Sequence, residues 1–290
     1  MAELLSSQYS SVYSQPSSPM LYPQDIFVNA DTEGLENFVF APDDFVVAID
    51  ELKPTAAAGP DGFPAKLLKE CKKTLKVPLF LIWRKSMDKG IVPSLLKTAN
   101  VIPIHKGKSK GVPANYRPVA LTSHIIKVFE KILRNHIVQY MEDHSLFNPT
   151  QHGFRKGRSC LSQLITHYEN IISNLEAGKN VDVIYLDFAK AFDKVDFLII
   201  LKKLNSMGIK GKIGTWIHSF LTNRTQRVLV NGESSKPSAV ISGVPQGSVL
   251  GPLLFLVLIG DIDKNVSSAF ISSFADDTRA THDIENDADR

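Results

Sequence analysis

Apolar residues recur every three or four positions over several stretches of this chain, which is the spacing that places them on one face of a helix. The pattern is clearest over residues 125–140, where Thr122 or Ser123 can serve as the N-cap. The same spacing predicts further helices over residues 42–52, 64–75, 77–90, 161–175, 197–207, 213–221 and 249–259. No segment repeats with a period of roughly 20–50 residues, so a repeat architecture is not indicated.

Short apolar runs between turn residues predict strands. Residues 101–105 and 117–121 flank a loop rich in lysine and glycine, so they are expected to pair as a basic hairpin. Residues 227–230 and 239–241 are also expected to pair, because Asn231-Gly232 is typical of a two-residue hairpin turn. The chain is therefore predicted to combine helices with antiparallel strands.

Two other predicted strand segments carry acidic residues at their ends. The apolar run of residues 181–188 contains VIYLD and places Asp187 at the strand exit, and residues 269–282 can form a hairpin around Asp276-Asp277. If these strands are neighbours in one sheet, three carboxylates converge, and such oxygen ligands suit hard divalent cations. Two Mg²⁺ ions roughly 3.5–4 Å apart would stabilise the attacking and leaving oxygens of a phosphoryl transfer.

A structural interpretation of the acidic pair is also available. Asp-Asp is an ordinary turn dipeptide, and the chain contains a second one at Asp43-Asp44 without comparable neighbours. The pair at residues 276–277 therefore indicates chemistry only together with other motifs.

Composition excludes several classes of protein. The longest apolar run, residues 249–259, is interrupted by Gly251 and Pro252 and is shorter than the roughly 20 residues of a membrane-spanning helix. The start of the chain lacks a basic segment followed by an apolar one, so an intracellular location is expected, without a distinction between nucleus and cytoplasm. The two cysteines, Cys71 and Cys160, form no CxxC pair and do not indicate a disulfide framework or a zinc site.

The net charge of +3 averages two segments of opposite sign. Residues 84–134 contain eleven Lys and Arg against two acids, whereas residues 261–290 contain eight acids against three bases. Basic residues on one face attract a phosphate backbone through counterion release, which favours a nucleic-acid partner. A solvated basic surface is the alternative interpretation.

Seven sequence blocks follow one another along residues 42–281: GPDGFPAKLLK, ANYRPVALTS, the helix ending in HIVQYM, QHGFRKGRSC, VIYLDFAKAFDKVD, SGVPQGSVLGPLLF and SFADDT. In this order they resemble the reverse transcriptases of non-LTR, LINE-like retrotransposons such as the jockey-type mobile elements. The resemblance implies an RNA-directed DNA polymerase that uses an RNA template, a DNA primer and dNTPs. It also implies two Mg²⁺ ions as cofactors, with Mn²⁺ as an alternative, and it says nothing of the oligomeric state.

The resemblance also implies an α+β right-hand polymerase fold, with an antiparallel palm sheet and packed helices. Residues 1–24, which are rich in Ser, Gln, Tyr and Pro, are expected to be a flexible leader. Residues 25–178 would form mostly helical fingers with the basic hairpin, and residues 179–290 the palm. Because the sequence ends thirteen residues after Asp277, the thumb is expected to be absent, as is an upstream endonuclease.

Matching positions transfer the metal site of the family to Asp187, Asp276 and Asp277, joined by the backbone carbonyl of Phe188. Phe192, five positions after the first aspartate, matches the steric gate that presses on the sugar and rejects a 2′-hydroxyl. A core phenylalanine is the alternative interpretation of that residue.

Further matches concern the substrates. Gln246 and Gly247 in GVPQGS match the loop near the incoming base and template, where glycine permits close backbone approach. Arg117 and Lys106 match the residues that clasp the triphosphate, with Lys108 and Lys110 as alternatives to Lys106.

Arg155 and Arg158 in GFRKGRS match a template-contacting segment, although a solvated basic loop would also explain them. Two other functions remain compatible with these motifs. One is a retrotransposon remnant that binds nucleic acid without catalysis, and the other is a different two-metal enzyme such as a nuclease.

Overall fold

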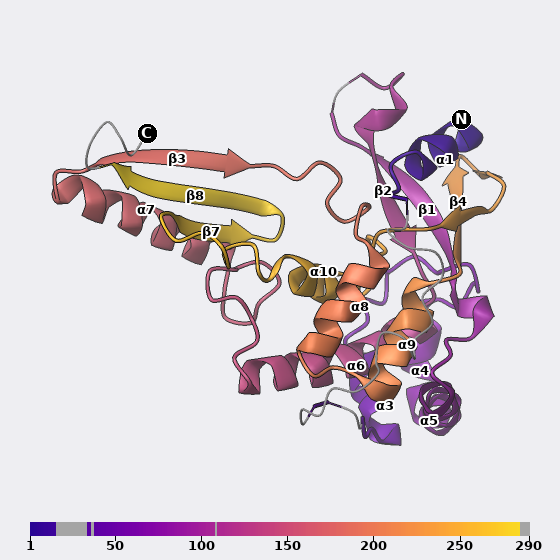
Figure 1. Cartoon of the computed structure of the whole chain (residues 1–290). Helices are drawn as coiled ribbons and strands as arrows, with labels where there is room; N and C mark the ends of the chain where they lie inside the picture. The colour runs from indigo at the N-terminus through magenta and orange to yellow at the C-terminus, as the bar shows by residue number, and fades with distance from the viewer. Residues whose placement is uncertain (16–33, 36–37, 108, 285–290) are drawn as a thin grey trace.

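The computed structural model describes residues 1–15, 34–35, 38–107 and 109–284. Within this part of the chain lie nine α-helices and two β-sheets, which form a mixed α/β fold (Figure 1). One sheet lies close to the main group of helices, and the other extends from it with a single long helix alongside. No helix among these residues is both long and apolar enough to span a bilayer. Lys108, residues 16–24 of the predicted leader and residues 285–290 lie outside the described residues.

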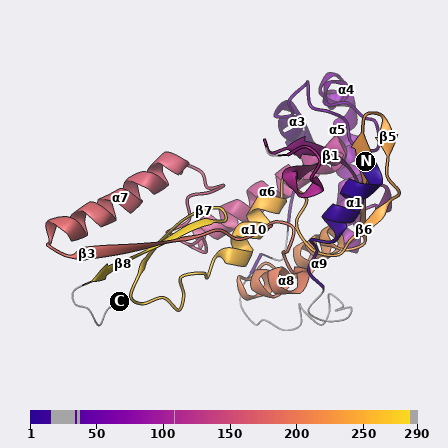
Figure 2. The same cartoon turned by 90° about the horizontal axis from the view of Figure 1, so that it is seen from above.

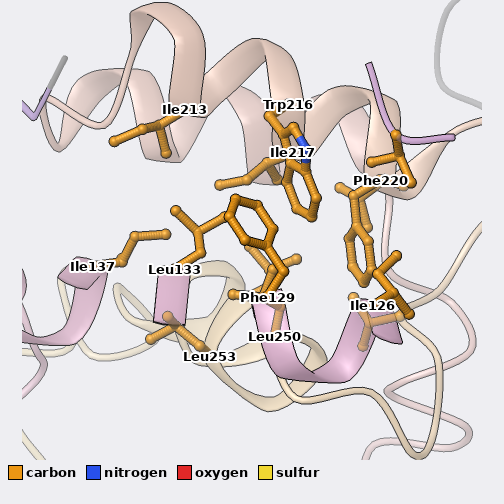
Figure 3. Packing of buried hydrophobic residues seen from close by; sticks show 14 of the residues in the cluster. Ile126, Phe129, Leu133, Ile137, Ile213, Trp216, Ile217, Phe220, Leu250 and Leu253 are labelled. Carbon is orange, nitrogen blue, oxygen red and sulfur yellow. The ribbon is translucent and has the colours of Figure 1, made fainter. Parts of the chain in front are cut away.

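The main helical group buries the largest apolar cluster of the described residues. The ring of Phe129 lies edge-on to Trp216 at 5.2 Å (Figure 3). It also stacks on Trp83 at 4.5 Å. The helices of this group are α3 (Pro42–Asp50), α4 (Ala65–Glu70), α5 (Lys72–Lys89), α6 (His124–Asp143), α8 (Phe197–Ser206), α9 (Gly211–Leu221) and α10 (Gly251–Ile259). The apolar spacing therefore predicted these helices correctly, and Ser123 is the N-cap of α6. The predicted boundary between residues 75 and 77 is wrong, because the break falls at Cys71 and α5 continues through Pro78.

The first sheet joins distant parts of the sequence. Its order is β2-β1-β4-β5, and β6 pairs with β4. The predicted basic hairpin is confirmed as the antiparallel pair β1 and β2, and β4 lies parallel to β1. The strands are β1 (Thr98–His105), β2 (Tyr116–Leu121), β4 (Arg224–Val230), β5 (Glu233–Ser234) and β6 (Ser238–Val240), with short 3-10 helices at Ser94–Leu96 and Pro113–Asn115. Residues on both sides of position 178 thus share this sheet and the apolar core, and the division at that position stays a prediction.

Helix α1 (Ala2–Ser10) packs on the first sheet, beside β4 and β6 (Figure 2). Leu5 and Tyr9 are buried against Val101 and Val228 in a small apolar cluster of their own. The expectation of a flexible leader is therefore wrong for these residues. Leu5 and Tyr9 are only one helical turn apart, and such a short apolar pattern does not predict a helix. The residues that they pack against come from strands that are distant in the sequence.

The second sheet has the order β3-β8-β7 and is antiparallel throughout, as predicted. Its strands are β3 (Asn180–Leu186), β7 (Phe270–Phe274) and β8 (Asp277–Ile284). Helix α7 (Cys160–Glu176) lies alongside this sheet (Figure 1). Polar side chains attach the helix: Gln163 donates to the Ser272 hydroxyl at 2.8 Å, and the His167 ring contacts the Thr281 hydroxyl at 3.4 Å.

Acid should weaken the attachment of α7. Burial lowers the pKa of His167, with a smaller contribution from the charge of Arg279, and burial likewise lowers the pKa of His152, whose ring contacts the Ser162 hydroxyl. The folded state therefore favours neutral rings, so this stability is present above the unfolded pKa of about 6.5 and is lost as pH falls below it.

We expect faster amide exchange in α7 at pH 5.5 than at pH 7.5, after correction for intrinsic rates. Most of that difference should disappear in the His152→Gln/His167→Gln double variant. Substitution of the exposed His144 by Gln is the control and should leave the difference intact. An equal pH response in the double variant and the original chain would contradict the role of these two rings.

Candidate active site

The second sheet brings the predicted acidic residues to one end. In its antiparallel pairing Leu186 lies opposite Thr278, so Asp187, the next residue, leaves β3 beside the turn that carries Asp276 and beside Asp277, the first residue of β8. Asp187 and Asp276 both line one large cavity, and Asp277 does not. Among the described residues no three His, Cys, Asp or Glu side chains are grouped closely enough to form a metal cage. The structure thus brings the carboxylates to one place without a preformed ligand set.

A buried glutamine fixes the turn between β7 and β8. The side-chain oxygen of Gln151 accepts hydrogen bonds from the backbone N–H of Ala275 at 2.8 Å and of Gly153 at 2.7 Å. Its side-chain nitrogen donates to the Ala275 carbonyl at 3.1 Å. Ala275 has a positive φ of 56°, and these bonds hold that conformation directly before Asp276. Sequence reasoning missed Gln151, although it begins the QHGFRKGRSC block.

The cavity has a volume of about 700 Å³ and gathers most of the residues assigned from the sequence. They come from both sheets and from the loops around α8 and α10. The predicted residues that line it are Lys106, Arg117, Asp187, Phe188, Phe192, Gln246, Gly247 and Asp276. Asp277, Arg155 and Arg158 are not among its lining residues. This convergence could not be derived from the spacing of the motifs alone.

The loop of residues 242–247 forms one wall and is tied to two neighbours. Ala120 in β2 donates its N–H to the Gln246 carbonyl at 2.8 Å, and Val244 donates its N–H to the Phe192 carbonyl at 2.9 Å. A Cβ on Gly247 would lie 2.4 Å from the Ala120 carbonyl oxygen, so only glycine allows this approach to the strand. The side chain of Gln246 donates to a carboxylate oxygen of Asp193 at 2.8 Å.

Phe192 combines both interpretations suggested by its sequence position. Its ring stacks on Phe255 of α10 at 4.3 Å and meets Phe154 edge-on at 6.2 Å. The residue nevertheless remains half-buried and lines the cavity. Its packing fixes the ring, and its position leaves part of the ring available to a molecule in the cavity.

Charges of both signs face this cavity. Arg117 of β2 lies opposite Ile104 of β1, and Lys106 directly follows the last residue of β1. Both cationic residues line the cavity, as does Lys190. Burial raises the pKa of Asp193, whereas the hydrogen bond from Gln246 and the nearby cations act in the opposite direction. Cations beside carboxylates suit a ligand that is itself a polyanion with bound metal.

Arg155 and Arg158 have internal partners. Arg155 pairs with Glu142 at 3.0 Å, its side chain is only 10% exposed, and its guanidinium lies 4.2 Å from the centre of the Phe147 ring. Arg158 donates to the backbone carbonyls of Pro149 and Gln151. Both arginines therefore stabilise the loop that carries Gln151, and their contact with a template stays a prediction.

Comparisons with known proteins agree with this arrangement. Residues 104–290 match the family described as reverse transcriptase (RNA-dependent DNA polymerase). The chain is 28% identical over 243 residues to a probable RNA-directed DNA polymerase from transposon BS of Drosophila melanogaster, covering 81% of this chain and 27% of that protein. It is 30% identical over 208 residues to the RNA-directed DNA polymerase from mobile element jockey of the same organism, covering 69% and 23%. The chain thus spans about a quarter of the length of these relatives.

Proposed function

This chain belongs to the reverse transcriptase (RNA-dependent DNA polymerase) family, and we propose that it carries the nucleotidyl-transfer centre of an RNA-directed DNA polymerase. One observation carries the proposal: a single cavity is lined by two of the predicted carboxylates, Asp187 and Asp276, and by the predicted nucleotide-binding residues. The proposed substrates are an RNA template, a DNA primer and dNTPs. The helical group with the β1–β2 hairpin would act as fingers, and the second sheet as part of the palm.

Reverse transcriptases generally use divalent metal ions, and the donors at this site are oxygens, which Mg²⁺ prefers. We assign Asp187 and Asp276 as the ligands, assisted by Asp277 and the carbonyl of Phe188. When bound, Mg²⁺ would activate the primer 3′-hydroxyl and neutralise charge on the phosphates. The fit is supported by the shared cavity, whereas a complete cage would require the substrate phosphates as additional ligands.

The cationic residues of the β1–β2 hairpin are placed to hold the triphosphate. Arg117 offers a planar pair of donors and Lys106 a mobile ammonium, and both line the cavity on the side of β2. Gln246 and Gly247 form the adjoining wall beside the base and template. These residues would orient the α-phosphate toward the primer, which lowers the barrier mainly by positioning.

Phe192 should determine the choice of sugar. We expect Phe192→Val to reduce the preference for dNTP over rNTP by about tenfold or more, because the ring edge that would meet a 2′-hydroxyl is removed. The measurement is the ratio of kcat/KM for dGTP and rGTP in single-nucleotide extension. Phe255→Leu, which alters the same ring stack from the side of α10, is the control and should change the ratio far less. Equal ratios for Phe192→Val and the original chain would show that Phe192 does not select between the two sugars.

The function is tested by primer extension on an RNA template with Mg²⁺ and dNTPs. The proposal expects template-directed extension that stops when the metal is chelated. Binding of the primer–template without any extension would favour a non-catalytic nucleic-acid-binding protein. Loss of nucleic acid in the absence of dNTPs would favour a two-metal nuclease instead.

A further inference from the structure

The start of the chain contacts the loop of residues 242–247, which forms one wall of the large cavity described above. That cavity is called the nucleotide cavity below. Residues 2–15, called the N-terminal arm below, precede the part of the chain that matches the family, residues 104–290. The arm is anchored by Leu5, which is 1% exposed, and by Glu3, whose carboxylate accepts the backbone N–H of Lys236 at 2.8 Å. Helix α1 is thereby fixed across β4 and β6 (Figure 2).

A chain of hydrogen bonds leads from the arm to the cavity. The N–H of Ser14 donates to the Ser242 hydroxyl at 3.0 Å, and that hydroxyl donates to the Asp193 carbonyl at 2.8 Å. The Asp193 carboxylate accepts the side-chain amide of Gln246 at 2.8 Å. The Ser14 hydroxyl also donates to the Lys194 carbonyl at 3.3 Å. Each step joins segments that are far apart in the sequence.

The wall that carries Gln246 separates two cavities. A second cavity of about 60 Å³, room for about two water molecules, lies between the arm and the wall. Tyr9, Val12 and Tyr13 of the arm line it. Five residues line both this cavity and the nucleotide cavity: Pro118, Lys190, Asp193, Pro245 and Gln246. The wall is therefore thin, and the arm supplies part of the lining behind it, together with residues of β1, β4, β6, α6 and α9.

We propose that the N-terminal arm is a positioning element of the nucleotide site, which holds Gln246 in place through Ser14, Ser242 and Asp193. Its effect on catalysis rests on the proposed function, whereas its effect on the order of the loop does not. The arm contacts no substrate and acts through the wall. Detaching it should weaken binding of the incoming dNTP and leave the carboxylates at the end of the second sheet unchanged.

The matched pair Leu5→Asp and Leu4→Asp tests this proposal in the full chain. Both substitutions place the same charge on α1, but Leu5 is buried and Leu4 is 55% exposed, so only the first should detach the arm. Leu5→Asp is expected to increase amide exchange at Gly243, Val244, Gln246 and Gly247 by about fivefold to tenfold, the factor for loss of one hydrogen bond. It should raise the KM for dNTP by a similar factor with little change in kcat. Leu4→Asp should behave as the original chain in both measurements.

Ser242→Ala provides a second variant that leaves α1 in place and removes the hydroxyl at the centre of the chain of bonds. It should reproduce the increased exchange and the higher KM. Unchanged exchange at the same four amides in both Leu5→Asp and Ser242→Ala would overturn the proposal, as would increased exchange with an unchanged KM. If the original chain itself fails to extend a primer, the proposed function fails, and the exchange data still decide whether the arm orders the loop.

Discussion

Asp187→Asn is expected to reduce dNTP incorporation on the order of a thousandfold, because it removes a charged oxygen ligand where the metals and transferring phosphate would meet. The amide has nearly the same shape as the carboxylate, and Asp187 lies beyond the last paired residue of β3, so the thermal midpoint should hardly change. The measurement is the rate of single-nucleotide extension at saturating dNTP. A loss in rate without a loss in stability would place the effect in catalysis.

Asp182→Asn is the matched control, because Asp182 is an exposed aspartate on the same strand, five residues earlier. It should retain the original rate. Extension by Asp187→Asn at the rate of the control would refute the assignment of this carboxylate, whatever the family. The same assay separates the acidic pair: Asp276 lines the cavity and Asp277 does not, so the first substitution should cost more than the second.

Local pattern was sufficient for most of the fold. The spacing of apolar residues predicted α6, with Ser123 as one of two candidate N-caps. The Asn231-Gly232 turn was placed correctly, but the expected pairing of residues 227–230 with 239–241 is wrong, because the turn joins β4 to the short strand β5 and β6 pairs with residues 224–226 instead. Local pattern was insufficient where tertiary contacts decide. Leu5 and Tyr9 form a helix because β1 and β4 cover them, and the parallel pairing of those two strands has no local signal.

In the candidate site, too, some residues could be predicted from the sequence and others depend on tertiary contacts. Resemblance to a family indicated the carboxylates and the cationic residues, since these stand at recognisable positions within the motifs. It did not indicate Gln151 or Asp193, which act by holding other groups in place. Gln151 satisfies the backbone of Ala275, and Asp193 accepts the side chain of Gln246. Such roles depend on which distant atoms come within hydrogen-bonding distance, and only the folded chain determines that.

A single methyl group at Gly243 should disrupt the packing of the loop of residues 242–247. Gly243 donates its N–H to the Val195 carbonyl at 2.8 Å and has a positive φ of 81°. A Cβ there would lie 2.7 Å from the carbonyl oxygen of Asp193 and 2.8 Å from that of Phe192. Both atoms belong to backbone that cannot move without displacing the wall of the nucleotide cavity.

Gly243→Ala is therefore expected to lower the free energy of unfolding by roughly 2–5 kcal/mol, the sum of the left-handed conformation and the steric overlap. Gly232→Ala isolates the first contribution, because Gly232 has a φ of 85° and no atom within 4 Å of an added Cβ. It should cost only about 1–2 kcal/mol. Denaturant unfolding of the two variants measures the difference directly. Equal losses would mean that the loop of residues 242–247 yields to the methyl group, and the tight packing of Gly243 against Phe192 and Asp193 would then contribute nothing to stability.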